Sequence, residues 1–115
     1  MKKYIAVLLA FVLTLSMAAC SSGSKDKRTL ETFKKAYTDA GMVLENEDVP
    51  LFKMIGAKDG ILFYTDGQKV AVYEFETEKA LKDSALISGW PANGRFALET
   101  SNAEAITVFN GVKDQ

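Results

Sequence analysis

Residues 61–75 read ILFYTDGQKVAVYEF, and this stretch decides the fold. Two runs rich in β-branched and aromatic residues, 61–65 and 70–75, flank the dipeptide Asp66-Gly67. That dipeptide between such runs is a strong hairpin signal, so two antiparallel strands joined by a tight turn are predicted. The second run is apolar on both faces over much of its length, which places it in the centre of a sheet.

Two helices are predicted before the hairpin. The first covers residues 29–41, because apolar side chains recur there at helical spacing. These side chains are Leu30, Phe33 and Tyr37. A short second helix is predicted to begin near Pro50 and to end at Gly56. Its inward-facing side chains are expected to be Leu51, Met54 and Ile55. The acidic residues 45–48 between the two helices are interpreted as a polar link.

After the hairpin the same pattern is repeated. Residues 77–84 are predicted to be helical, and strands are predicted at 86–90 and 95–100 around the turn signal Asn93-Gly94. Ser101 and Glu104 have capping-box spacing and are expected to open a last helix. The predicted order is α-α-β-β-α-β-β-α. It corresponds to a single small α+β domain over residues 29–115, with two layers and the helices on one face of a four-stranded antiparallel sheet.

The N-terminus has the layout of a secretory signal. Lys2 and Lys3 form a basic start, residues 4–15 are apolar apart from Thr14, and small residues lead to Cys20, the single cysteine of the chain. The apolar stretch is shorter than the roughly 20 residues that a membrane-spanning helix needs. An ordinary signal peptide or an uncleaved anchor would also fit this layout.

Ala18, Ala19 and Cys20 match the end of a lipobox, so the segment resembles the bacterial lipoproteins processed by the type II signal peptidase. The resemblance implies a signal peptide at 1–19, cleavage before Cys20 and a diacylglyceryl thioether on its sulfur. Met17 departs from the pattern, since leucine is commonest there. Residues 20–28 would then be the lipidated cysteine and a flexible tether rich in serine.

This resemblance implies a lipid-anchored protein on the extracytoplasmic face of the cell membrane. In a host with two membranes, Ser21 beside the lipidated cysteine would permit outer-membrane sorting. The part after the tether also bears a faint resemblance to small Gram-positive envelope lipoproteins of unknown function. That second resemblance carries no catalytic motif.

Composition limits the partners. Removing 19 of the 115 residues leaves 96, and without Lys2 and Lys3 the 14 basic residues become 12 against 15 acidic ones, a net charge near −3. A nucleic-acid binder would show a basic stripe instead, so no nucleic acid is expected. With no second cysteine, an intramolecular disulfide is impossible.

The residues that carry chemistry are few. The sequence contains no histidine, which excludes histidine-dependent triads and most zinc sites. It has no nucleotide-binding motif, so neither enzymatic activity nor a cofactor is expected. Glu74, Glu76 and Glu78 fall at alternate positions and could hold a hard cation, although a solvated sheet edge is the plainer interpretation.

Trp90 and Arg95 are the candidate binding residues. Trp90 stands beside a turn, and Arg95 follows the next turn across the predicted second hairpin. An exposed tryptophan with a nearby arginine is a typical binding anchor, while a tryptophan that covers one end of the core is the alternative. The sequence therefore predicts a non-catalytic module that binds another envelope protein or a peptide. A surface lipoprotein that binds a small ligand or cation is the alternative, and a carboxylate-based hydrolase is a third.

Overall fold

The hairpin of residues 61–75 is present at the centre of the molecule. The computed structural model describes residues 26–113; the predicted signal peptide, Cys20 and the first part of the predicted tether lie outside the described residues. Strands β2 (Asp59–Thr65) and β3 (Gln68–Glu74) pair antiparallel, with Thr65 opposite Gln68. Asp66 and Gly67 have φ angles of 52° and 76°, as a two-residue type I′ turn requires. The predicted hairpin and its turn are confirmed.

The α+β class is confirmed, but the sheet has five strands where four were predicted. All neighbours are antiparallel, in the order β1-β2-β3-β5-β4, so β3 is central as expected. The additional strand is β1 (Glu45–Asp48), which was predicted to be a polar link and is exposed along its whole length. An edge strand can be acidic because main-chain hydrogen bonds, not side chains, pair it with its neighbour. Its exposed charges also hinder unwanted pairing with strands of other molecules.

The second hairpin differs from its prediction in its first strand. Residues 86–90 do not form a strand: η2 (Ala85–Ile87) is a 3₁₀ helix, and Gly89 has φ of +89°. The partner of β5 (Phe96–Thr100) is instead β4 (Ala92–Asn93), and the turn between them is Gly94-Arg95. The left-handed backbone at Gly89 is incompatible with a continuous strand, so the chain becomes extended only after it.

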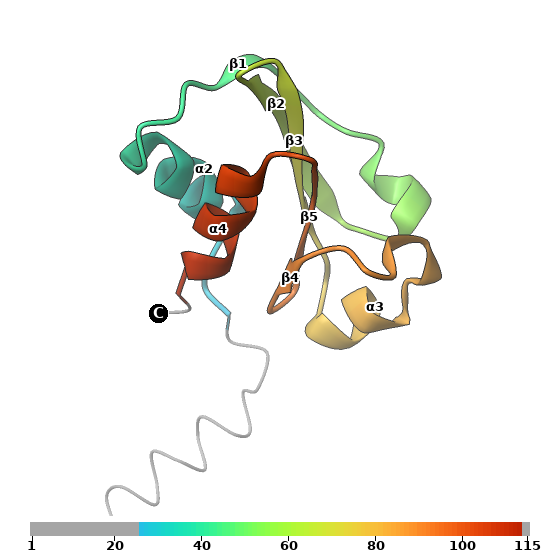
Figure 1. The fold of residues 1–115 in the computed structure, drawn as a ribbon. Helices are drawn as coiled ribbons and strands as arrows, with labels where there is room; N and C mark the ends of the chain where they lie inside the picture. Colours follow the sequence, from blue (N-terminus) through green and yellow to red (C-terminus); the bar gives the residue numbers. More distant parts are fainter. Residues whose placement is uncertain (1–25, 114–115) are drawn as a thin grey trace, which may run out of the picture.

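Helices cover both faces of the sheet, which corrects the predicted two-layer arrangement (Figure 1). The helices α2 (Leu30–Asp39) and α4 (Ala103–Gly111) pack on one face. The other face carries α3 (Glu78–Asp83), η1 (Phe52–Ile55) and η2. The strand β3 explains this, because its side chains are buried on both sides and each side needs a cover.

Each face has its own apolar cluster. The cluster under α2 and α4 contains Leu30, Phe33, Tyr37, Met42, Phe63, Val70, Val72, Phe96, Leu98, Ala105 and Phe109. The cluster under α3 contains Ala57, Ala71, Tyr73, Phe75, Leu81, Ile87 and Ala97. Successive residues of β3 and β5 belong alternately to the two clusters, because side chains along a strand point to opposite faces of the sheet in turn. The predicted inner face of the first helix is confirmed, since all three of its apolar side chains belong to the first cluster.

Two local predictions were wrong. The second helix is one 3₁₀ turn that ends at Gly56 as predicted, and Ile55 packs inward, but Leu51 and Met54, also expected to face inward, are 76% and 69% exposed. The cap of α4 is Asn102, whose Oδ1 accepts from the backbone N–H of Ala105 at 2.9 Å, one residue after the predicted Ser101. Within residues 26–113, no helix has the length and apolar character needed to cross a membrane.

Candidate functional site

The loop that carries Trp90 is held in place by its own hydrogen bonds. Thr77 caps α3 by accepting from the backbone N–H of Ala80 at 3.0 Å. Beyond that helix, the Ser84 hydroxyl donates to the carbonyl of Ile55 in η1 at 2.7 Å. The backbone N–H of Trp90 then donates to Ile87 at 3.0 Å. These bonds give Trp90 a defined position on the α3 face of the sheet.

The Trp90 ring is half-buried and rests on Tyr73 of β3. The ring centroids are 5.7 Å apart, and the ring planes make an angle of 37°. The Tyr73 hydroxyl donates to Glu99 at 2.9 Å. Burial, together with this bond and the Glu99 charge, raises the pKa of Tyr73, so the hydroxyl stays neutral. Trp90 thus packs on a fixed ring and still presents part of its own ring to solvent.

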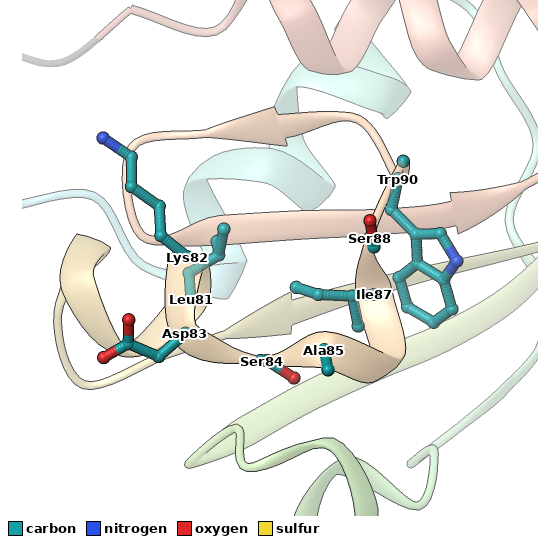
Figure 2. A pocket seen from close by; sticks show the side chains of 9 residues that line it. Leu81, Lys82, Asp83, Ser84, Ala85, Ile87, Ser88 and Trp90 are labelled. Carbon is teal, nitrogen blue, oxygen red and sulfur yellow. The ribbon is translucent and has the colours of Figure 1, made fainter.

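Two hollows meet at Trp90. The first has a volume of 580 Å³ and lies along α3 and η2 (Figure 2). The second has a volume of 380 Å³ and lies over β5, reaching Lys69 and Ser101. Gly89 and Trp90 line both hollows. We call this pair of hollows the Trp90 groove, and its volumes fall in the range of ligand-binding clefts.

The two ends of the first hollow differ in character. Figure 2 shows Trp90 at one end, Lys82 and Asp83 at the other, and Ile87 between them. Lys82 pairs with Glu78 at 3.0 Å, and Asp83 pairs with Lys79 at 2.9 Å. All four of these charges are exposed, so each pair is weak and a charged ligand can displace it. The groove thus combines an aromatic surface with exchangeable charges of both signs.

Arg95 does not join Trp90 in the groove. Its guanidinium binds the carboxylate of Glu74 and donates to the carbonyl of Arg28 at 2.8 Å. It also stacks over Phe96, 4.7 Å from the ring centroid. Only 12% of the side chain is exposed. The predicted Trp90–Arg95 pair is therefore corrected: Arg95 is largely buried against Glu74, whereas Trp90 is partly buried and packs against the apolar cluster of the α3 face, as the alternative interpretation expected.

The three glutamates are not gathered around one point. Glu74 is buried against Arg95 and shares Lys58 with the exposed Glu76, at 3.6 and 4.0 Å, whereas Glu78 pairs separately with Lys82. Among residues 26–113, no three acidic, histidine or cysteine side chains are grouped closely enough to hold a metal ion. The cation-binding alternative therefore has no geometric support in the described part of the chain.

Sequence reasoning missed a second polar site, centred on Arg28. Residues 26–28 were predicted to belong to the flexible tether, yet Arg28 is only 4% exposed. Its guanidinium binds Asp26 and the side chain of Asn93. Asp26 and Arg28, two residues apart, could have indicated an ion pair. The serine-rich residues before them favoured the interpretation of a flexible tether instead. Residues 26–28 therefore belong to the folded domain.

Comparison with known proteins gives no assignment. No protein-family model, curated protein or solved structure matches this chain.

Proposed function

We propose that this protein is a lipid-anchored module of the cell envelope that binds a peptide segment of another envelope protein in the Trp90 groove. One observation carries the proposal: the half-exposed Trp90 ring lies where two hollows of 580 and 380 Å³ meet. Aromatic side chains in such positions supply a large share of binding energy, because they bury much apolar area with few rotatable bonds.

The groove suits an extended peptide better than a reaction. Its titratable side chains are Lys82 and Asp83 in the first hollow and Lys69 and Glu99 in the second. Each is already in an ion pair. All four side chains are accessible to solvent, with exposures of 36–70%, so a bound peptide can displace each ion pair. A peptide could place an apolar side chain on Trp90 and a charged side chain near the end of α3.

The membrane attachment rests on the sequence. Ala18, Ala19 and Cys20 form the lipobox-like signal, and Cys20 precedes the first described residue by six positions. Two acyl chains on Cys20 would hold the domain permanently at the membrane surface. The partner would then be another protein of the same surface, with no nucleic acid involved.

The experiment is crosslinking of the full-length lipoprotein in cells of its host, followed by affinity capture. A reproducible partner that is absent with Cys20→Ala would support an anchored module. Trp90→Ala should weaken capture of that partner by at least about 30-fold, since a hot-spot residue contributes about 2 kcal/mol or more. Val43→Ala is the matched control, because Val43 is 68% exposed and lines neither hollow.

Two results would contradict the proposal. One is undiminished capture by a folded Trp90→Ala protein, which would move the binding surface elsewhere. The other is the absence of any partner combined with a thermal shift on adding small solutes, calcium or magnesium. That combination would favour the small-ligand alternative.

A further inference from the structure

The first described residues are fixed to the domain by a buried cluster of polar groups. Arg28 Nε and Nη2 bind the two carboxylate oxygens of Asp26 at 2.8 and 2.7 Å. Arg28 Nη1 donates to Asn93 Oδ1 at 2.8 Å and to the carbonyl of Val112 at 3.0 Å. We call Asp26, Arg28, Asn93, Arg95 and Val112 the anchor clamp. It ties residues 26–28 to Asn93 of β4 and to Val112 at the end of α4.

The second arginine of the clamp holds the backbone of the same segment. Arg95 Nη2 donates to the carbonyls of Arg28 and Asp26 at 2.8 and 3.3 Å. Because Arg95 also binds Glu74, the segment is connected to the central strand β3. A side chain at Gly94 would not fit, since a Cβ there would lie 2.5 Å from Arg28 Nη2. Charge-assisted, two-pronged contacts of this kind give a fixed geometry.

The clamp limits how far the domain can move from its lipid. Cys20 and Asp26 are six residues apart, so the chain between them spans at most about 22 Å when fully extended. We infer that the anchor clamp fixes the orientation of the domain, so that the clamp end faces an anionic lipid bilayer. This inference rests on the lipid anchor of the proposed function.

Two exposed lysines stand beside the clamp. Lys27, between Asp26 and Arg28, and Lys113, next to Val112, are exposed, and within residues 26–113 neither has an ion-pair partner. They are placed to meet phosphate headgroups. The turn between β2 and β3 lies at the other end of the sheet (Figure 1). Gln68 at that turn is six residues from Glu74 along β3, or about 20 Å. The acidic strand β1 lies beside the turn end of β2.

The test uses the full-length lipidated protein in vesicles of phosphatidylcholine with phosphatidylglycerol. A fluorophore is attached to Ala92→Cys, an exposed residue of β4 next to the clamp, or to Gln68→Cys at the turn between β2 and β3. Cys20 is blocked by its thioether. Quenching by spin-labelled lipid should be several-fold stronger for the Ala92→Cys label. The contrast should be lost when Asp26→Asn is added, and it should weaken in pure phosphatidylcholine or high salt.

Each result either supports or overturns the inferred orientation. Equal quenching of the two labels, or a contrast that survives Asp26→Asn, would overturn the inference. Thermal unfolding of the Asp26→Asn protein confirms that the domain is folded, and Asp26→Glu should restore part of the contrast. Flotation of the vesicles reports the lipid anchor separately. A protein that floats without a contrast disproves the orientation alone, whereas a protein that does not float disproves the anchor of the proposed function and the orientation with it.

Discussion

At the scale of single residues, the buried polar side chains of the described chain all form hydrogen bonds. Within the described chain, no buried side-chain nitrogen or oxygen lacks a hydrogen bond. Arg28 and Arg95 account for much of this, and Tyr37 adds a bond from its buried hydroxyl to the carbonyl of Ala105 at 3.1 Å. Leaving such a group unsatisfied would cost about 1–3 kcal/mol, so these residues should be sensitive to substitution.

Asp26 gives a pH-dependent prediction. Burial opposes its ionisation, but hydrogen bonds and charge from Arg28 outweigh this and hold its pKa below 3.8. A lowered pKa in the folded state means that the stabilisation is present above pH about 4 and is lost as the pH falls through the lowered value. Asp26→Asn should therefore reduce the free energy of unfolding by about 1.5–3 kcal/mol at pH 7. The loss should become smaller toward pH 2.

Urea denaturation of the unlipidated chain between pH 7 and pH 2 would measure this difference. Asp83→Asn is the control, because Asp83 is exposed and its ion pair should contribute no more than about 1 kcal/mol. A loss of stability for Asp26→Asn that is constant across the pH range would show that the Asp26 charge is unimportant.

At the scale of elements, the β2–β3 turn and the edge strand β1 follow different rules. The turn is specified locally, since Asp66 and Gly67 both need positive φ angles. The strand β1 has no local signal: it forms because its main chain can pair with β2 and because Glu47 meets Lys34 of α2. Turn chemistry is therefore readable in sequence, whereas an exposed edge strand is not.

Gly67→Ala tests the turn. Nothing lies within 4 Å of a Cβ at this position, so the cost would come only from the left-handed backbone. We expect a loss of about 1–2 kcal/mol in the free energy of unfolding, measured by chemical denaturation. Asp66→Asn should be neutral or slightly stabilising, because asparagine tolerates the same conformation. Equal behaviour of the two variants would argue against a type I′ turn.

At the scale of the whole molecule, the sheet joins two apolar clusters into one unit. Neighbouring residues of β3 enter opposite clusters: Val72 packs under α2 and α4, and Tyr73 packs under α3 and Trp90. Because the two clusters share the same strands, neither can lose its packing without disturbing the other. The molecule should therefore unfold in a single step.

Trp90, the single tryptophan, makes this testable. Phe33 of α2 is fully buried on the face of the sheet away from Trp90. Phe33→Leu should lower stability by about 1–2 kcal/mol, and the unfolding curves from Trp90 fluorescence and from circular dichroism should shift together. Val43→Ala should leave both curves unchanged. A fluorescence curve that does not move with Phe33→Leu would mean that the two faces unfold separately.

The sequence by itself determined the features that depend on neighbours in the chain. Residues 61–75 specified a hairpin through turn chemistry, and Leu30, Phe33 and Tyr37 specified a helical face through their spacing. It also identified Trp90 as a candidate surface residue. The hairpin and the helical face follow from turn chemistry and from periodicity, which a short segment has wherever it is placed.

Only the tertiary structure decided the rest. The pairing of β1, the covering of both sheet faces and the burial of Arg28 depend on segments that are distant in sequence; Arg28 and Asn93 are 65 residues apart. The same holds for Arg95, which the sequence placed beside Trp90 and the fold placed against Glu74 and the backbone of Arg28. A long polar side chain reaches any of several partners, and the partner is chosen by the packing of the whole chain.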